Sequence, residues 1–369
     1  MGFFESHTGS NLIWRNWVQN IAQHVNDPIY LQTHARVGYW EPCNECFRSP
    51  TLNPGYTATN YAYRGTYAQL VRMMQDARCI IKGNPDDAIT ALNTTCGQAG
   101  YPVIGIDPTA QMVVPDTAPG QAGTKQSPYA RVMQNTLYCT CSNNSCSASS
   151  TGCPTGSGGS RAVDIIATHL YPNTYTPEQL PTQNANVRSY LSATDLAKPL
   201  WSIEGGWGQN TAAQVKNDPD LEAAFVARYH LMVWASGTTR AYWYGWDYSL
   251  TGTLWSPTAI NGCSAQYANG YICRAGIAYQ QVHDWLVGAV LTACSVDGTT
   301  WLCRLTESNG SPAQIIWDTS QTCSNGSCGT IQHLVAPEYI KYRDLTGATF
   351  AVSGSMVPVG IKPILLETK

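Results

Sequence analysis

The sequence predicts an α/β protein in which a barrel of alternating strands and helices is followed by a small antiparallel β module. Short apolar strand patterns alternate with helical patterns up to about residue 250, as in repeated βα units. Polar and aromatic residues follow the strand ends, where (β/α)8 barrels place their chemistry. Beyond this region only one more helix and then short alternating strands are expected. We therefore expect a (β/α)8-type domain over residues 1–255 and a β-rich module, packed with it, over residues 256–369.

Hydrophobic periodicity defines the elements of the first domain. Apolar residues recur with a period near 3.6 over residues 11–25, which predicts a helix that Ser10 can cap. An open doubly wound sheet would obey the same strand-end rule, but no glycine-rich phosphate loop follows any of the strands. The other expected elements are helices over residues 61–81, 187–196 and 220–236, and strands over residues 35–40, 102–106, 163–170, 200–203 and 240–244.

The last third of the chain has a different pattern. One more helix is expected over residues 275–290, and alternating apolar residues between turn signals then predict an antiparallel β-sandwich module. Residues 135–160 are rich in Gly, Ser and Cys and are interpreted as a surface loop held by disulfides. The expected strands of the module cover residues 289–294, 300–305, 313–317, 338–344, 348–352 and 361–367.

The composition favours a carbohydrate partner over a nucleic acid or a membrane. Charged residues make up 12% of the chain and the net charge is −3, whereas nucleic-acid binding requires a basic surface. No apolar run reaches the roughly 18 residues of a membrane span. The 12 Trp and 21 Tyr residues far outnumber the 5 Phe residues. Their flat rings with polar edges suit sugars, although a large domain also buries aromatic residues in its core.

The 14 cysteines indicate disulfides and an oxidising compartment. Residues 1–5 lack the basic start of a signal peptide. We therefore expect a secreted protein on the basis of the cysteines alone. A metal site at Cys43 and Cys46 is the alternative, but no second cysteine or histidine pair stands at a zinc spacing. Three pairs bracket short loops that could close with Cα atoms about 5.5–6 Å apart: Cys263–Cys273, Cys294–Cys303 and Cys323–Cys328.

Two glutamates stand at the ends of predicted strands. Glu45 follows the stretch Tyr39-Trp40-Glu41-Pro42-Cys43-Asn44, and Glu204 ends Leu200-Trp201-Ser202-Ile203. A buried carboxylate is costly unless it is paired or used. A retaining glycosidase needs two such groups, about 5–5.5 Å apart, of which one protonates the leaving oxygen and the other attacks the anomeric carbon.

These stretches resemble clan A glycoside hydrolases, which are retaining (β/α)8 barrel enzymes. The resemblance implies that Glu45 is the acid/base, with Asn44 and Trp40 beside it, and that Glu204 is the nucleophile. We then expect a higher pKa for Glu45 than for Glu204. The resemblance also implies that the substrate is contacted by a set of strand-end residues: Asn44, Trp40, His169, Tyr171, Trp207, Trp243 and Trp246.

The chain departs from the clan pattern in two respects. If Tyr39 and Trp40 form the fourth strand of the barrel, about 35 residues precede it, where three βα units need on the order of 100. The first three βα units are therefore expected to be lacking. Either the sequence is a fragment of a longer protein, or the chain is a partial barrel that covers its exposed sheet edge by self-association. The second departure is Cys43, where the clan usually has a large apolar residue.

Several alternatives stay open. Glu41 could be the working acid with Glu45 as a loop salt-bridge partner, and Glu204 could be a structural carboxylate. His169, Trp243 and Trp246 could be ordinary packing residues at the rim of the barrel. No cofactor or metal is expected. The principal expectation is a retaining β-glycosidase acting on a polysaccharide or oligosaccharide, and its alternative is a non-catalytic carbohydrate-binding or scaffold derivative. The sequence does not predict the glycan, its linkage or exo or endo action, because loops determine these properties.

Overall fold

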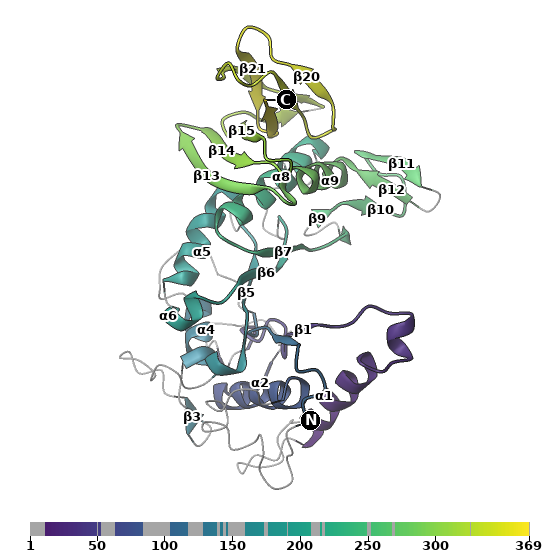
Figure 1. Cartoon of the computed structure of the whole chain (residues 1–369), viewed down its shortest axis with the longest axis vertical. Helices are drawn as coiled ribbons and strands as arrows, with labels where there is room; N and C mark the ends of the chain where they lie inside the picture. Colours follow the sequence, from purple (N-terminus) through teal and green to yellow (C-terminus); the bar gives the residue numbers. More distant parts are fainter. Residues whose placement is uncertain are drawn as a thin grey trace. The chain divides into compact units, whose positions relative to one another are not determined.

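The structure is a computed structural model, and its described residues form two compact units (Figure 1). The first unit comprises Met1–His169 and Asn186–Trp201, and the second comprises Leu170–Ala185 and Ser202–Lys369. The predicted domain boundary at residue 255 stays a prediction. The described residues are 12–49, 51–52, 63–83, 104–116, 128–138, 141–142, 145–146, 159–172, 176–189, 191–207, 215, 218–248, 252–267, 270–324 and 326–368.

Parallel strand pairs organise the first unit. Strand β1 (Tyr39–Trp40) pairs in parallel with β2 (Gln111–Met112). Val113 then bridges Ile165 in parallel, directly before β5 (Ile166–Leu170). Its helices are α1 (Leu12–Val25), α2 (Tyr67–Ile81) and α4 (Pro128–Tyr138), and its short elements are η1 (Tyr30–Gln32), η2 (Ser160–Ala162), β3 (Cys141–Ser142) and β4 (Ser145–Cys146).

Helix α1 packs on α2 through its predicted apolar stripe. Trp14, Val18 and Ala22 are buried one turn apart, as the 3.6-residue period requires. The indole N–H of Trp14 donates to the carbonyl of Met73 at 3.0 Å. Arg15 forms a buried ion pair of 2.7 Å with Asp76 of α2, which also pairs with Arg72 at 3.2 Å, so the buried charge of Arg15 is compensated. The expected cap Ser10 lies outside the described residues.

The expected strand over residues 102–106 is wrong for the part that the structure describes. The N–H groups of Gly105, Ile106 and Asp107 donate to the carbonyls of Cys79, Ile80 and Ile81. They therefore satisfy the last carbonyls of α2, which a helix end leaves without partners. Gly105 has φ +61°, a conformation that favours glycine. The strand occurs a few residues later, as β2.

Two helices differ from their expected bounds because of capping. The expected helix over residues 61–81 begins at Tyr67, where Thr66 and Gln69 form a capping box. The expected helix over residues 187–196 is divided into α5 (Leu180–Arg188) and α6 (Ala193–Leu196), and Ser192 caps the latter. Helix α4 extends to Tyr138, so residues 135–138 are helical and not part of the expected loop.

The second unit is built around helix α8 (Pro219–Ala235). In this unit, strand β7 (Arg240–Trp243) is a neighbour of β6 (Leu200–Gly205), which belongs to the unit from Ser202 on. Helix α8 is buried on every side, with Phe225, Tyr229 and Met232 fully inside. A helix that is apolar all round must be covered on all faces. Its core cluster includes residues of α9 (Arg274–Leu286) and of the β module.

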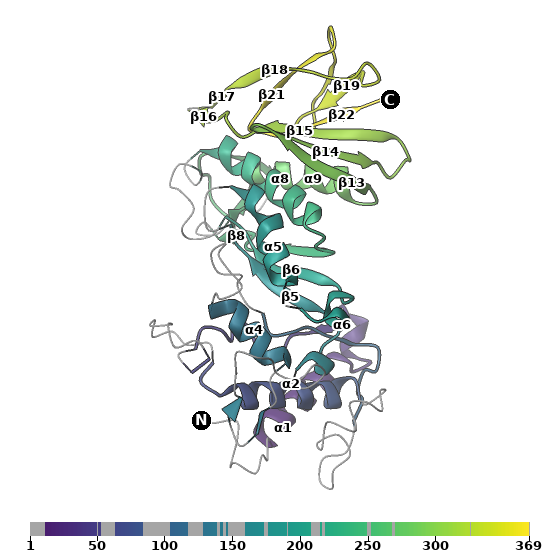
Figure 2. The ribbon, with the colours of Figure 1, turned by 90° about the vertical axis from the view of Figure 1, so that its left-hand side faces the viewer.

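The six predicted strands of the β module are confirmed, and all lie in one sheet (Figure 2). The sheet is antiparallel throughout, in the order β13-β14-β15-β22-β19-β20. A separate antiparallel pair, β18 with β21, packs against it. The strands are β13 (Val290–Asp297), β14 (Thr300–Thr306), β15 (Pro312–Asp318), β18 (Thr330–Leu334), β19 (Lys341–Arg343), β20 (Thr349–Ala351), β21 (Met356–Gly360) and β22 (Ile364–Glu367).

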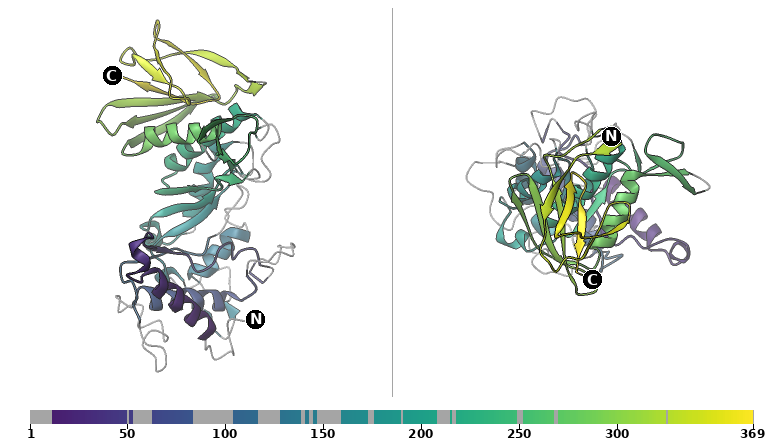
Figure 3. Two further views of the ribbon diagram at one scale, coloured as in Figure 1. Left: turned by 90° about the vertical axis from the view of Figure 1, so that its right-hand side faces the viewer. Right: turned by 90° about the horizontal axis from the view of Figure 1, so that it is seen from above.

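The sheet has two buried faces, which explains the apolar run in β15. Ile315 and Trp317 belong to the core shared with α8 and α9, whereas Ile316 belongs to the core shared with β18 and β21. Neighbouring residues of a strand point to opposite faces, so both sets are apolar. Figure 3 shows α9 lying along the β13–β15 side of this sheet. One face of the six-stranded sheet is therefore covered by the β18–β21 pair, and the other face is covered by helices α8 and α9.

The three predicted hairpin disulfides are confirmed. Cys263–Cys273, Cys294–Cys303 and Cys323–Cys328 each join residues directly opposite in an antiparallel pair. Their Cα atoms are 3.7, 4.0 and 4.0 Å apart, closer than expected because opposite residues approach closely across such ladders. The remaining short elements are η3 (Pro177–Gln179), β8 (Asp247–Tyr248), β9 (Gly252–Thr253), β10 (Trp255–Ser256), β11 (Cys263–Tyr267), β12 (Gly270–Cys273), β16 (Cys323–Ser324) and β17 (Ser327–Cys328).

Among the described residues, none of the helices is both long and apolar enough to cross a membrane.

A buried charge cluster connects three elements of the second unit. Arg228 of α8 lies with its Nε 3.2 Å from Oε1 of Glu178 in η3, and both side chains are over nine-tenths buried. The indole N–H of Trp317 in β15 donates to the same oxygen at 2.8 Å. Burial lowers the pKa of the Arg228 guanidinium, and the charge of Glu178 opposes this shift. Arg228 therefore depends on the charge of Glu178 to stay protonated at this buried position.

We expect Glu178→Ala to lower the free energy of unfolding of the second unit by about 3–5 kcal/mol, because it leaves Arg228 buried without its partner. This change is measured by unfolding the protein in urea and monitoring the hydrogen exchange of the β13–β15 amides. Glu338→Ala, at an exposed position, is the matched control and should cost less than about 0.5 kcal/mol. Similar losses in both variants would contradict a stabilising role for the buried pair.

Candidate active site

Glu45 stands in a tight loop directly after β1. The loop is closed by a disulfide between Cys43 and Cys46, which brackets Asn44 and Glu45. Because both thiols are used in this disulfide, the alternative of a metal site at Cys43 and Cys46 is excluded. Glu45 has φ +49°, the left-handed region that a non-glycine residue seldom adopts. Outliers of this kind persist where the surroundings hold them and are frequent at functional sites.

The surroundings of Glu45 are charged and largely buried. Its backbone N–H donates to Oδ1 of Asp116 at 2.5 Å. Its Oε2 accepts a hydrogen bond from Arg48 at 2.6 Å. Its Oε1 lies 3.3 Å from Nδ1 of His169, the side chain of which is 1% exposed. The carboxylate of Glu45 is thus held from both sides by cationic or N–H groups.

His169 lies between two carboxyl groups of the first unit. Its Nδ1 faces Glu45, and its Nε2 lies 3.1 Å from Oδ2 of Asp116. The Asp116 side chain is fully buried. The backbone N–H of Asp116 donates to Oε1 of Glu41 at 2.9 Å, so Glu41 also belongs to this cluster. The structure therefore brings together His169, Glu45 and its alternative Glu41.

The pKa values of the two carboxyl groups that face His169 shift in opposite directions. Burial raises the pKa of Glu45, but hydrogen bonds from His169 and Arg48 outweigh this effect and hold it below the ordinary value. The expectation that the pKa of Glu45 exceeds that of Glu204 stays a prediction. The hydrogen bonds that lower the pKa of Glu45 were not evident from the sequence. Burial raises the pKa of Asp116 well above its ordinary value, and the charge of His169 only partly opposes this shift.

Asp116 and Arg48 are site residues that sequence reasoning missed. Asp116 follows the buried residues Met112, Val113 and Val114, so it carries the same signal that identified Glu45: a carboxylate after an apolar strand. The apolar run at residues 102–106 predicts the strand too early in the chain, which hides this signal. Arg48 sits three residues after Glu45 in a loop, where the sequence pattern gives no indication of an ion pair.

Glu204 lies near the end of β6 in the second unit. The hydroxyl of Tyr171 donates to its Oε1 at 2.6 Å, so the structure brings these two predicted site residues together. Gly205 follows, and a Cβ at this position would come within 1.8 Å of the Tyr229 hydroxyl. That hydroxyl donates to the carbonyl of Leu170 at 2.9 Å. Glycine is therefore required at position 205, because the Tyr229 hydroxyl occupies the place of a Cβ.

The predicted aromatic site residues differ in their surroundings. Trp207 is 1% exposed and packs edge-on against Trp243, with ring centroids 5.5 Å apart. Trp246 is 57% exposed. Trp40 is partly buried and Asn44 is exposed in the first unit. Their roles as sugar contacts stay predictions, as does the 5–5.5 Å separation of Glu45 and Glu204, which belong to different units.

We expect Glu45→Gln to be less stable than the wild type at neutral pH, and the difference to shrink as the pH falls below 4.5, the ordinary pKa of this group. The sign follows from the lowered pKa: ionised Glu45 stabilises the folded chain above its ordinary pKa, and this contribution disappears as the pH falls through the lowered value. Thermal unfolding between pH 7 and pH 3 measures the difference.

The control for this prediction is Arg48→Gln, introduced both into the wild type and into the Glu45→Gln variant. Since Arg48 is one of the two groups that lower the pKa of Glu45, its removal should reduce the stability cost of Glu45→Gln at neutral pH. A cost that is independent of pH would show that Glu45 acts by packing and not by charge.

Comparison with known proteins identifies the fold. No protein-family model and no curated protein sequence matches the chain. Among solved structures, a family 39 glycoside hydrolase from Bacteroides cellulosilyticus WH2 is 14% identical with a TM-score of 0.57, and the match covers 98% of this chain and 63% of that one. The chain thus spans less than two thirds of the length of this neighbour.

Two further structures are similar. A conserved exported protein from Bacteroides fragilis is 10% identical with a TM-score of 0.53, covering 96% of this chain and 69% of that one. The GH51 arabinofuranosidase from Xanthomonas axonopodis pv. citri is 9% identical with a TM-score of 0.51, covering 95% and 72%. The fold class predicted from the sequence is therefore confirmed: the chain has a TIM-barrel-type α/β fold like that of these solved structures, with an antiparallel β module.

Proposed function

We propose that this protein is a retaining glycoside hydrolase that cleaves β-glycosidic bonds in a polysaccharide or oligosaccharide. The observation that carries the proposal is the pair of strand-end glutamates, each held by its own polar partners on a fold that glycosidases use. Glu204, held by Tyr171 at 2.6 Å, attacks the anomeric carbon and forms a glycosyl-enzyme. Glu45 protonates the leaving oxygen and then, as a base, takes a proton from the water that releases the sugar.

The acid step requires a proton that the lowered pKa of Glu45 does not favour. We assign this proton to Asp116, whose buried carboxyl has a raised pKa. In the acid-ready form that we propose, His169 is neutral, so that its charge no longer opposes the raised pKa of Asp116. Its Nδ1 carries a proton toward Glu45 and its Nε2 faces the protonated Asp116, with the atom pairs 3.3 and 3.1 Å apart. The proton of Asp116 can then pass through the imidazole to Glu45 as the leaving group departs.

Secretion is also part of the proposal. Four disulfides are formed among the described cysteines, and disulfides persist in oxidising compartments. One structural neighbour is described as an exported protein. Self-association of the chain stays a prediction.

We expect Glu204→Ala to lower the hydrolysis of an aryl β-glycoside by several orders of magnitude, because no covalent intermediate can form. Azide should rescue this variant and give a glycosyl azide of inverted configuration, because it fits the space that the carboxylate vacates. The chain is tested together with any coding sequence that adjoins it in the genome, on aryl β-xylosides, β-glucosides and β-mannosides. If the wild type hydrolyses none of these or their polysaccharides but binds glycan, the non-catalytic alternative replaces the enzyme.

The matched variant is Glu45→Ala. Its loss should reach roughly 10²–10⁴-fold for poor leaving groups and be small in the first step for 2,4-dinitrophenyl glycosides, which need little protonation. Glu41→Ala distinguishes the alternative acid. If the dependence on the leaving group appears in Glu41→Ala and not in Glu45→Ala, the roles of these two residues are exchanged.

We expect Asp116→Asn to impair acid catalysis selectively. The amide can still accept the N–H of Glu45 but has no acidic proton to pass to His169. Hydrolysis of poor leaving groups should fall by part of the roughly 10²–10⁴-fold that general acid catalysis supplies, with good leaving groups nearly unaffected and the pH profile altered. Asp107→Asn, at a buried aspartate of the same unit, is the control. An equal loss for all leaving groups would indicate a structural role for Asp116.

A further inference from the structure

A pocket of about 230 Å³ lies within the second unit, at the N-terminal turns of α8 and α9 and against the β module. None of its lining residues belongs to the candidate active site. Its lining combines a charged group, Asp220 with Arg274 and Lys362, and an aromatic pair, Tyr342 with Phe350. Pockets that join apolar walls with a few convergent polar groups are typical of small-molecule sites.

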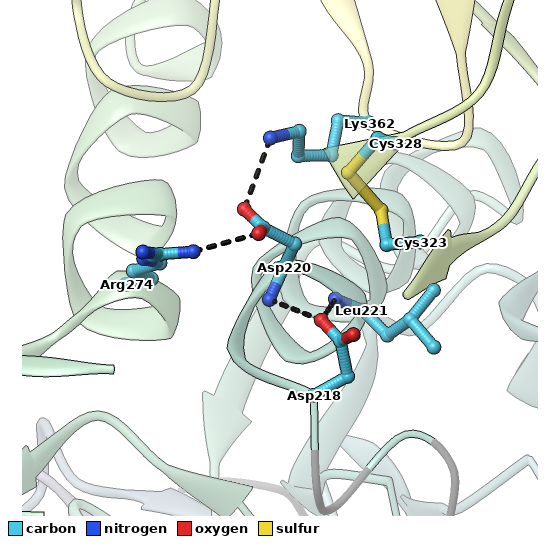
Figure 4. The surroundings of a disulfide bond; sticks show 7 residues. All are labelled: Asp218, Asp220, Leu221, Arg274, Cys323, Cys328 and Lys362. Atoms are coloured by element: carbon cyan, nitrogen blue, oxygen red, sulfur yellow. Dashed lines mark hydrogen bonds and ion pairs between the residues drawn. A yellow bond between two sulfur atoms is a disulfide. The ribbon is translucent and has the colours of Figure 1, made fainter. Parts of the chain in front are cut away.

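The charges in this pocket compensate one another (Figure 4). Asp220 accepts from Arg274 at 2.6 Å through Oδ2 and from Lys362 at 3.0 Å through Oδ1. The second carboxylate of the lining, Asp344, is used in a turn, where Oδ1 accepts from the N–H groups of Thr346 and Ala348 at 2.8 and 3.1 Å. Two cations thus stand beside two carboxylates. This balance disfavours an anion or a metal ion and favours a neutral polar ligand.

The donors of the pocket remain partly accessible. The side chains of Arg274 and Lys362 are 50% and 35% exposed. An arginine carries five N–H donors, of which the contact with Asp220 uses one. Asp220 accepts from the guanidinium of Arg274 and from the ammonium of Lys362, so both groups are positioned before a ligand binds. Fixed donors lose little entropy on binding.

The aromatic wall supplies the other half of the recognition. Tyr342 and Phe350 are opposite residues of the β19–β20 pair, and their rings stack at 5.1 Å with an angle of 22°. Phe350 is 42% exposed, so the outer part of this wall is open to solvent. A sugar ring has an apolar C–H face, which packs on an aromatic ring, and hydroxyls at its edge, which accept from charged N–H groups.

We propose that this pocket binds a neutral oligosaccharide segment and thereby forms a second carbohydrate site in the β module. The inference rests on the proposed function for the class of glycan, since a polysaccharide hydrolase would hold its own substrate there. The aromatic wall takes the face of a sugar unit, and Arg274 and Lys362 bind its hydroxyls.

The test uses the full chain with Glu204→Ala, which prevents hydrolysis, in native gels that contain arabinoxylan, mixed-linkage β-glucan or glucomannan. We expect at least one of these glycans to retard the protein, and Phe350→Ala to weaken that binding about tenfold, which corresponds to the loss of one aromatic contact of about 1.4 kcal/mol. Phe350→Tyr should restore it. Leu334→Ala, at a 70% exposed position of β18, is the matched control and should bind as its parent does.

Two further arms separate the possible outcomes. Because the ligand is neutral, binding should change little between low and high salt, whereas salt-sensitive binding of polygalacturonate in preference to the neutral glycans would overturn the proposal. Lack of retardation by all three neutral glycans, or equal binding of Phe350→Ala and its parent, would also overturn it. Thermal unfolding of each variant excludes misfolding as the cause. Hydrolysis without Phe350-dependent binding rejects only this inference, and Phe350-dependent binding without hydrolysis rejects only the enzyme.

Discussion

The buried pair of Arg228 and Glu178 is the constraint on which much of the second unit depends. A guanidinium in a helix that is buried on every side is tolerated only with its counter-charge in place, so the position of η3 along α8 is fixed. The indole N–H of Trp317 donates to the same carboxylate oxygen of Glu178, so the buried pair also contacts strand β15 of the β module. One residue further along α8, Tyr229 fills the space beside Gly205 and binds the carbonyl of Leu170. The helix that carries the pair therefore also fixes the strand end that presents Glu204.

The first unit solves a different electrostatic problem. The carboxyl groups of Glu45 and Asp116 face a buried imidazole, and a third carboxyl group, that of Glu41, accepts the backbone N–H of Asp116. Like charges at such distances cannot all stay ionised, and the structure divides them: Glu45, held by Arg48 and His169, has a lowered pKa, and the more deeply buried Asp116 has a raised one. Groups whose surroundings push their pKa values apart are typical of acid/base sites. The left-handed backbone of Glu45 within its disulfide loop fits the same interpretation.

The sequence was most informative where structure is local. The six strands of the β module and the three hairpin disulfides follow from alternation and from cysteines that are 5 to 10 residues apart. It was least informative where a segment serves another element. Residues 104–106 read as a strand, but their N–H groups complete the end of α2. The hidden strand at residues 111–112 is short, and its pairing with β1 is decided about 70 residues away along the chain.

The sequence by itself determined the fold class, the β module and two candidate glutamates, because periodicity and strand-end position are properties of neighbouring residues. Only the tertiary structure decided what surrounds those glutamates. Asp116 reaches the N–H of Glu45 across 71 residues, and His169 reaches its carboxylate across 124. Such contacts depend on the order in which strands pair, which a local pattern does not encode. The pKa of a carboxyl depends on these partners and on its burial, so the sequence placed Glu45 after a strand but did not reveal the groups that lower its pKa.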